Sequence, residues 1–359
     1  MEEELYAVDE VVEKMCADNY FPGATYAVSN GKTNYIGFKG NKSLIPTVEK
    51  NSIDTLYDVA SLTKVIVTNT ILAKALQERK INLFDKLEKY LPEYEYLNVT
   101  VYDLATHSSG LPADLDTHAI HSNEELLKQL SEVKKTYETG TDIVYSDIGF
   151  ILLGKALEKI YNKSLEELAI EKVFKPLDMN SSTFKPQREK TAPTELTKER
   201  GLVWGKAHDE KSYYSNSILG HAGLFSTVDD IRKFTDMILN DGVVNGEVYL
   251  EKECLDLWFT PCLVGKDNIA RSIGWIYGKC KCITGENVSE NTISHTGFTG
   301  TSIVLDRDNK RSVILLSNRV HPARDNIKLI YDRHLLVDEV LEAKIMLQKK
   351  INYKVAFAI

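Results

Sequence analysis

The order of strand-like and helix-like segments limits the folds that this chain can adopt. Strand-like runs occur near the start, at residues 24–29 and 33–38, and return after about residue 217. Between about residues 82 and 200 the pattern is mostly helix and loop. This order predicts an α+β fold, in which an antiparallel sheet is flanked by terminal helices and a mostly helical region is inserted between the sheet's two sequence halves.

The same order predicts how the chain divides. We expect residues 1–80 and 205–350 to form one composite sheet-plus-helix domain and residues 81–204 to form a mostly helical inserted domain. Sites that are built from two domains lie at the surface where the domains meet. We therefore expect the functional site at this interface.

Local patterns place the individual elements. Asn30-Gly31-Lys32 lies between the first two strand-like runs and predicts a hairpin turn. From about Asp58 to Lys80, apolar residues recur at three- and four-residue steps, which predicts a helix with one buried face. Residues 147–161 form a second expected helix, with Asp147 near its N-terminus. The remaining expected elements are strands at 223–227, 272–278, 301–306 and 312–317, a turn at 307–310 and an amphipathic terminal helix from about 323 to 350.

Charge and hydropathy argue against several classes of protein. The net charge of −8 opposes general binding to nucleic acid or to anionic membranes, because both require a basic surface. No run approaches the ~20 continuous apolar residues of a membrane helix. The chain starts with the acidic segment MEEELYAVDE, whereas a secretory signal has a basic start followed by an apolar run. We therefore expect a cytoplasmic protein without a membrane segment or a nucleic-acid partner.

The cysteines favour reduced thiols. Five are present, and an odd number without a secretory signal opposes a disulfide framework. Their spacing includes a C-x-C pair but no C-x-x-C pair, which matches common zinc sites poorly. We expect no metal and no cofactor. The cysteines are Cys16, Cys254, Cys262, Cys280 and Cys282.

A first candidate for chemistry is the S-x-x-K segment Ser61-Leu62-Thr63-Lys64. Residues three apart on a helix share a face, so the lysine ammonium could touch the serine hydroxyl. A free serine hydroxyl is a poor nucleophile and needs a neighbouring group that manages its proton. The chain contains four such matches, but only Ser61 begins a long apolar helix. On its own the segment could equally be a first-turn serine and a surface lysine.

A second candidate is Tyr145-Ser146-Asp147. A lysine ammonium nearby favours the phenolate form of a tyrosine, which could take the serine proton and return it to a leaving group. Tyr214-Ser215-Asn216 offers a similar pattern. We favour Tyr145 because it opens the helix expected at 147–161, whereas Tyr214 lies in a polar stretch without a helical pattern behind it.

A third candidate is His295-Thr296-Gly297, which leads toward the strand at 301–306. Its glycine and Gly300 allow a ligand to approach the backbone closely. A backbone N–H here could complete an oxyanion hole with the N–H of Ser61. The same residues could also be a plain bend between two strands.

Together and in this order, the motifs resemble those of the serine β-lactamase and penicillin-binding protein superfamily. The similarity is to its class C β-lactamase-like branch, which includes D-alanyl-D-alanine peptidases, D-aminopeptidases and esterases. It extends from about residue 20 to residue 345. The segments that carry it are PGATYAV (22–28), YDVASLTK (57–64), LATHSSGLP (104–112), YSDIGFILLG (145–154), GHAGLFST (220–227) and HTGFTG (295–300).

The resemblance implies a role for each matching residue. Ser61 matches the nucleophile, Lys64 its general-base partner and Tyr145 the catalytic tyrosine. His295, Thr296 and Gly297 match the substrate-binding strand, where class C β-lactamases have lysine in place of the histidine. The backbone N–H of Phe298 matches the second oxyanion donor.

The chain departs from the family pattern at two positions. Asp147 stands where the family usually has asparagine, and a carboxylate near Lys64 favours the ammonium form, which shifts proton transfer toward Tyr145. His295 replaces lysine, and a mostly neutral imidazole holds a substrate carboxylate less firmly than an ammonium. Efficient β-lactam hydrolysis is therefore not expected.

The expected function is a metal-free serine hydrolase that forms an acyl-enzyme on Ser61. The resemblance favours a D-amino-acid peptide as substrate, as in a DD-carboxypeptidase, or a related amide. A promiscuous esterase or weak β-lactamase, and a sensor that a β-lactam or peptide acylates without turnover, remain alternatives. The sequence leaves open the oligomeric state and whether Arg271, Arg319 or Arg324 binds a substrate carboxylate. His208-Asp209 and His221 could lie near the cleft, whereas His118 and His121 are expected at the surface.

Overall fold

The computed structural model describes residues 2–29, 34–266 and 268–340. Its largest element is a nine-stranded sheet with the order β10-β11-β12-β13-β14-β15-β1-β2-β3. The paired strands are antiparallel throughout. The first three strands of the chain and its last six strands thus belong to the same sheet. This confirms the predicted α+β fold. The strands are β1 (Gly23–Ser29), β2 (Asn34–Ser43), β3 (Glu49–Lys50), β10 (Leu263–Val264), β11 (Ala270–Arg271), β12 (Ile276–Tyr277), β13 (Thr292–Thr296), β14 (Ser302–Asp306) and β15 (Arg311–Ser317).

Each face of this sheet packs against its own hydrophobic core. Side chains alternate along a strand, so neighbours in β15 point to opposite faces. Val313 and Leu315 belong to one core, whereas Ile314 and Leu316 belong to the other. The smaller core includes Val12 of the N-terminal helix α1 (Glu2–Ala17) and residues of the C-terminal segment. The terminal helices therefore cover one face, as predicted.

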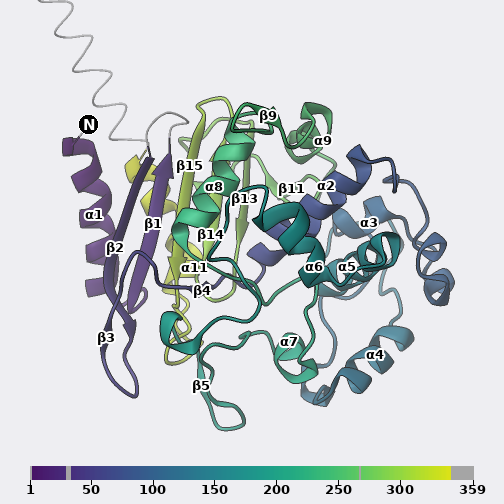
Figure 1. Cartoon of the computed structure of the whole chain (residues 1–359), viewed down its shortest axis with the longest axis horizontal. Coiled ribbons are helices and arrows are strands. Elements are labelled where there is room, and N and C mark those ends of the chain that lie inside the picture. Colours follow the sequence, from purple (N-terminus) through teal and green to yellow (C-terminus); the bar gives the residue numbers. More distant parts are fainter. Residues whose placement is uncertain (1, 30–33, 267, 341–359) are drawn as a thin grey trace, which may run out of the picture.

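The larger core joins the other face to the remaining helices. Helix α8 (Val228–Leu239) crosses this face in front of β15, and the helices of the middle of the chain gather beside it (Figure 1). The other helical elements are the π-helix η1 (Lys64–Thr68), α2 (Asn69–Gln77), α3 (Val101–Ala105), α4 (Asn123–Glu132), α5 (Asp147–Tyr161), α6 (Leu165–Ala169), the π-helix η5 (Ile170–Phe174), α7 (Glu210–Ser215), α9 (Lys252–Asp256), α10 (Lys281–Thr284), α11 (Lys328–Asp332) and the short 3₁₀ helices η2 (Leu87–Lys89), η3 (Pro92–Leu97), η4 (Thr117–Ala119), η6 (Arg188–Lys190) and η7 (Leu257–Phe259). The division into domains at residues 80 and 205 remains a prediction.

Several predicted boundaries change. The helix expected from Asp58 begins only at residue 62, because Tyr57 and Asp58 form strand β4 and pair with β7 (Phe225–Ser226). The strand expected at 272–278 shortens to β12 (Ile276–Tyr277). Two further small hairpins occur, one of β5 (Leu196–Thr197) with β6 (Gly201–Leu202) and one of β8 (Val243–Val244) with β9 (Glu247–Val248).

Other predictions hold within the described residues. Helix α5 spans the predicted 147–161, and the turn at 307–310 joins β14 and β15. Strands β1 and β2 pair as a hairpin with Ser29 opposite Asn34, while the turn at 30–33 lies outside the described residues. The terminal helix expected at 323–350 is instead the short α11 followed by helical residues 334–340, and residues 341–350 are not described.

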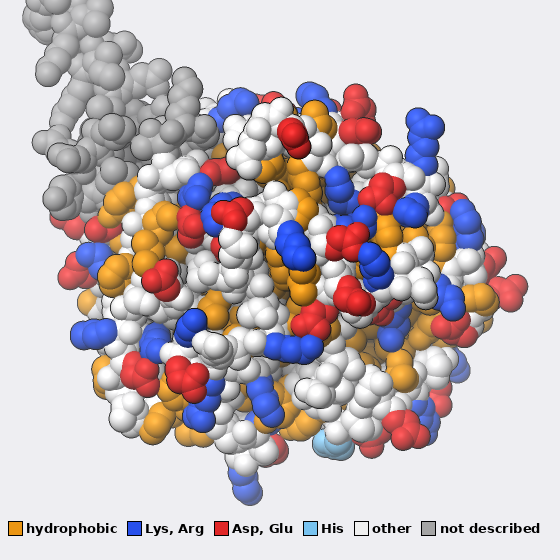
Figure 2. Space-filling view, viewed as in Figure 1, with side chains coloured by type: hydrophobic (Ala, Val, Ile, Leu, Met, Phe, Trp, Pro, Cys, Tyr) orange, Lys and Arg blue, Asp and Glu red, His pale blue; other side chains and the backbone are white. Residues whose placement is uncertain are grey.

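The surface carries charged side chains of both signs, as expected from the sequence composition. Basic and acidic side chains are interspersed over the face in Figure 2, with small apolar areas between them. None of the helices among the described residues is both long and apolar enough to cross a bilayer.

Candidate active site

Ser61 lies at the turn where strand β4 passes into helix η1. The preceding residue, Ala60, has a left-handed backbone with a φ of 48°, which costs an L-residue about 1–2 kcal/mol. The Asp58 side chain accepts a hydrogen bond from the Ala60 N–H (2.8 Å), and the Thr63 hydroxyl donates to the Ala60 carbonyl (2.7 Å). These bonds hold a strained turn that presents the Ser61 hydroxyl at the start of the helix.

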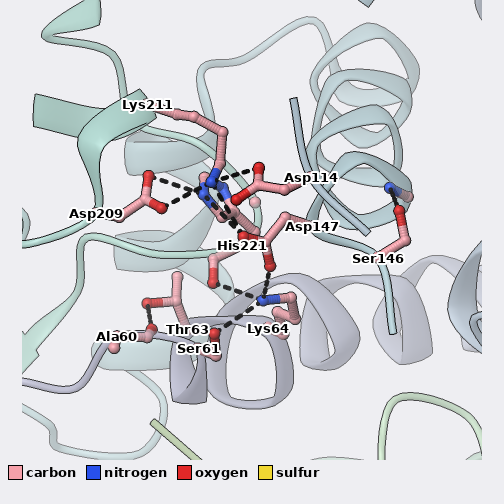
Figure 3. Close-up of polar contacts among 12 residues, drawn as sticks. Ala60, Ser61, Thr63, Lys64, Asp114, Ser146, Asp147, Asp209, Lys211 and His221 are labelled. Atoms are coloured by element: carbon pink, nitrogen blue, oxygen red, sulfur yellow. Dashed lines mark hydrogen bonds and ion pairs between the residues drawn. The ribbon is translucent and has the colours of Figure 1, made fainter. Parts of the chain in front are cut away.

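Lys64 lies one turn further along the same helix and is fully buried. Its Nζ atom is 3.0 Å from Ser61 Oγ, 2.7 Å from Asp147 Oδ1 and 3.3 Å from the His221 carbonyl oxygen (Figure 3). An ammonium has three protons to donate, so these three acceptors satisfy it. Burial alone would lower the pKa of Lys64, but the charge of Asp147, with a smaller contribution from Tyr145, outweighs burial and raises that pKa. Lys64 is therefore an ammonium that donates to Ser61.

Tyr145 lies beside this ammonium. Its ring centroid is 4.7 Å from Lys64 Nζ, 4.6 Å from the His107 ring centroid and 6.0 Å from the His295 ring centroid. The next residue, Ser146, caps helix α5 and donates its backbone N–H to His107 Nδ1 (3.0 Å). The cap and the histidine thus fix the segment that carries the tyrosine.

Asp147 contacts Lys64 and does not serve as the helix cap, a role that Ser146 takes. Its second oxygen, Oδ2, is 3.1 Å from Nζ of Lys211, a residue that the sequence did not single out. The cations around Asp147 overcome the effect of burial and hold its pKa below the usual range of a carboxyl. The predicted contact between Asp147 and Lys64 is therefore present.

Lys211 is buried and belongs to a larger cluster of charges that reaches the surface at Asp114. Its Nζ atom is also 2.8 Å from Asp114 Oδ1 and 2.9 Å from Asp209 Oδ2. His221 Nε2 is 2.9 Å from Asp209 Oδ1, so His221 and Asp209 pair inside the protein. Although Asp147, Asp209 and His221 present donor atoms within 4.8 Å of one another, these carboxylates already bind the ammonium groups of Lys64 and Lys211. We assign no metal site to them.

His295 lies near the end of strand β13 and is buried. Its Nδ1 atom is 3.0 Å from the Thr296 carbonyl oxygen. Burial, together with the nearby charges of Lys64 and Arg271, lowers its pKa well below the usual range of a histidine. The imidazole at this position is therefore neutral at pH 7, as the sequence predicted.

The loop after His295 is fastened to the segment before Ser61. The hydroxyls of Thr299 and Thr301 donate to the backbone carbonyls of Asp58 (2.7 Å) and Val59 (3.0 Å). A Cβ atom on Gly297 would overlap Thr301 Oγ1 and the Val59 carbonyl oxygen, so only glycine fits there. In the part of the chain that the structure describes, the Ser61 and Phe298 backbone N–H groups have no hydrogen-bond acceptor. These two N–H groups remain available to a ligand.

These residues surround one cavity of about 560 Å³. The cavity brings together Ser61, Tyr145, Asp147 and the segment 295–298, whereas Lys64 lies beneath its wall. The three arginines that the sequence left open all line it, as do His118 and His208. Tyr214 does not line it and lies in helix α7, contrary to the expectation that no helix is present there. Sequence analysis missed Lys211, Asp114 and Arg333, because their contacts come from distant segments and carry no local motif.

The arginines differ in their partners. Arg324 is paired with Glu195 (2.5 Å) and Glu210 (2.6 Å). Arg319 donates to the Asn326 carbonyl (2.7 Å), and Arg333 donates to the Gly297 carbonyl (3.2 Å). Within the described residues, Arg319 and Arg333 form no ion pair with a carboxylate, although both are buried to at least nine-tenths. Burial and the charge of Arg319 lower the pKa of Arg333 to about 10.

Comparison with known proteins identifies the family. A sequence model of the beta-lactamase family matches residues 8–338. An N-acetylmuramyl-L-alanine amidase of Bacillus subtilis is 28% identical, with 88% of this chain and 81% of the amidase aligned. A putative D-alanyl-D-alanine carboxypeptidase of Escherichia coli K12 is 30% identical, with 76% of this chain and 71% of that protein aligned.

Solved structures show the same fold. The structure of a class C beta-lactamase aligns with this chain with a TM-score of 0.73 at 23% sequence identity. The alignment covers 95% of this chain and 96% of the beta-lactamase chain. The structure of EstCE1, a hydrolase with promiscuous acyltransferase activity, aligns with a TM-score of 0.77 at 16% sequence identity. That alignment covers 94% of this chain and 99% of the EstCE1 chain. The chain therefore belongs to the beta-lactamase family, and it is a hydrolase of the β-lactamase fold. This confirms the resemblance inferred from the sequence motifs.

The buried histidines predict a pH-dependent stability. His107 and His295 both have a pKa well below the usual range because of burial. In the unfolded chain each titrates near pH ~6.5. Below that pH the unfolded state binds protons that the folded state does not, so stability is complete above about pH 6.5 and falls as the pH drops. We expect a total loss of about 1.4 kcal/mol for each histidine between about pH 7.5 and pH 5.5, measured by urea unfolding.

The variant His107→Asn isolates one of these contributions. Asparagine tolerates the left-handed backbone of this residue, with a φ of 59°, and its side-chain oxygen can accept the Ser146 N–H. Because burial also lowers the pKa of His321, the loss of stability on acidification should shrink in this variant by the share of one histidine among three. His118→Gln, at an exposed histidine, is the control and should keep the full slope. An unchanged slope in His107→Asn would show that His107 is not held neutral by the fold.

Proposed function

We propose that this protein hydrolyses an amide of a D-amino-acid peptide, or a related amide, through an acyl-enzyme on Ser61. The observation that carries the proposal is the 3.0 Å contact between Ser61 Oγ and a buried Lys64 Nζ at the wall of a cavity. A buried ammonium that donates to a serine oxygen leaves the serine proton free to point toward another group. We propose Tyr145 as the group that receives it, and its ring centroid 4.7 Å from that ammonium supports this role.

The proposed reaction has two steps. In the first, Ser61 Oγ attacks the substrate carbonyl and its proton passes to the oxygen of Tyr145, which acts as the general base beside the Lys64 ammonium. The N–H groups of Ser61 and Phe298 would stabilise the oxyanion, and Tyr145 would return the proton to the departing amine. In the second, water attacks the acyl-enzyme, and Tyr145 takes and returns a proton in the same way.

Several features support a peptide or amide substrate. One relative is named as an amidase of N-acetylmuramyl-L-alanine and another as a putative D-alanyl-D-alanine carboxypeptidase. The neutral His295 offers no cation at the position where class C β-lactamases have a lysine, which disfavours β-lactam hydrolysis. A promiscuous esterase is the second candidate, because the cavity wall includes the apolar side chains of Ile276, Phe298 and Ile330 beside Ser61.

The acyl-enzyme is tested by intact-mass measurement after incubation with a fluorophosphonate. We expect one adduct on the wild-type protein and none on Ser61→Ala. The control is Ser131→Ala, at another S-x-x-K match on the exposed side of helix α4, which should keep the adduct. An adduct that persists in Ser61→Ala would refute the proposed nucleophile. Turnover of a D-Ala-D-Ala peptide, p-nitrophenyl acetate and nitrocefin then separates an enzyme from a sensor, since a sensor gives a burst of acylation without turnover.

The arginines of the cavity favour a substrate with a carboxylate. Arg324 is already paired with Glu195 and Glu210, whereas Arg319 and Arg333 lack an acidic partner among the described residues. We therefore propose that Arg319 and Arg333, and not Arg324, attract the substrate anion.

This assignment predicts a selective effect of Arg319→Gln. The value of kcat/KM for a peptide with a free C-terminal carboxylate should fall at least about tenfold, because one charge-assisted contact is lost. The loss for the same peptide with an amidated C-terminus should be smaller, and Arg319→Lys should recover part of the activity. Equal losses for both peptides in Arg319→Gln would contradict the assignment.

A further inference from the structure

A second buried lysine lies behind the site and is not used by the proposed reaction. Lys211 has a side chain that is only 1% exposed, and it does not line the cavity. Its ammonium is held by Asp114, Asp147 and Asp209, at distances of 2.8, 3.1 and 2.9 Å. These carboxylates outweigh the effect of burial and raise the pKa of Lys211 above its usual range. Lys211 is thus a permanent cation at neutral pH.

The fold fixes this lysine from several directions. Lys211 lies in the first turn of helix α7, whose N-cap is Asp209. Asp147 comes from the start of helix α5, and Asp114 from the loop after helix α3. His221, which pairs with Asp209, comes from the loop before β7 and lies 3.9 Å from Asp147 Oδ2. Figure 3 shows Lys211 on the opposite side of Asp147 from Lys64.

Asp147 is therefore shared by two cations. Oδ1 binds Lys64 at 2.7 Å, and Oδ2 binds Lys211 at 3.1 Å. A carboxylate held at both oxygens has a fixed orientation, so Oδ1 keeps pointing at the lysine that contacts Ser61. Lys211 also reduces the excess negative charge of the cluster, in which three carboxylates would otherwise face the single charge of Lys64. An excess of negative charge makes proton release from any neighbouring group harder.

We propose that Lys211 is a positioning residue for the reaction at Ser61. It orients Asp147 and offsets its charge, so that Asp147 can hold Lys64 against Ser61 without hindering the release of the serine proton. Asp147 and Lys211 would together replace the neutral asparagine that the class C-like pattern has at position 147. This inference rests on the proposed function, because it concerns the proton transfer that acylation requires.

The test is the pH profile of kcat/KM for p-nitrophenyl acetate in Lys211 variants. Lys211→Met removes the cation, and Lys211→Arg keeps it. Because Lys211→Met leaves buried carboxylates without a partner, Asp209→Asn/Lys211→Met is included, which removes one positive and one negative charge. The acidic limb of the profile reports the essential base, whichever residue it is.

We expect the acidic limb to move to higher pH by about one unit in Lys211→Met, and by less in Asp209→Asn/Lys211→Met, where the loss of a negative charge matches the loss of the cation. We also expect kcat to fall at least about tenfold with little change in KM, since Lys211 does not reach the cavity. Lys211→Arg should restore the position of the limb. Against an Asp147→Asn background, Lys211→Met should shift the limb no further, because no carboxylate remains for it to orient.

A wild-type pH profile in Lys211→Met, together with a wild-type kcat in Asp209→Asn/Lys211→Met, would overturn the inference. A shift of equal size with and without the carboxylate of Asp147 would also overturn it, because Lys211 would then act independently of Asp147. Failure of the proposed function looks different. In that case the wild-type protein forms no fluorophosphonate adduct on Ser61. If only the inference fails, the wild-type protein is still acylated on Ser61, and the Lys211 variants have the same pH profile and kcat as the wild type.

Discussion

The buried ion pair between Lys64 and Asp147 joins the parts of the chain that meet at the cavity. Lys64 lies on the helix that follows strand β4, Asp147 starts helix α5, and the His221 carbonyl completes the coordination of the ammonium. Removing one member of a buried pair commonly costs ~3–5 kcal/mol, because the other charge remains without a partner in the interior. The arrangement of the site and the packing of the helical region against the sheet are therefore coupled.

The rest of the site is organised by the backbone around Ser61. The left-handed turn at Ala60 is held by Asp58, whose main-chain carbonyl also accepts a hydrogen bond from Thr299. Gly297 lies against the Val59 carbonyl with no room for a side chain. The serine turn and the end of strand β13 therefore form a single unit. Direct hydrogen bonds fix the relative position of these two segments. They thereby also fix the position of the Ser61 and Phe298 backbone N–H groups.

Sequence analysis predicted the parts of this structure that depend on local patterns. Helix α5, the turn between β14 and β15, and the motifs at Ser61 and Tyr145 are encoded in a few consecutive residues. The start of the helix near Asp58 was wrong, because pairing of Tyr57 and Asp58 with β7 overrides the local helical pattern. Lys211 and Arg333 could not be found, because their significance depends on partners from segments far away in the chain. The contact of Asp147 with Lys64 was expected from the sequence motifs, whereas the structure shows that Ser146, the residue before it, caps helix α5.

The proposed chemistry depends on Asp147 keeping Lys64 protonated while Lys64 contacts Ser61. The most direct measurement is a pH titration by NMR of protein labelled with ¹³C at the lysine ε-carbon, with the Lys64 signal assigned by its loss in Lys64→Arg. We expect an ammonium signal that does not titrate between about pH 6 and pH 9, since the pKa of Lys64 lies above its usual value of ~10.4. A Lys64 signal that titrates to the neutral amine near pH 7 would contradict the proposed chemistry, because Lys64 itself would then be the base.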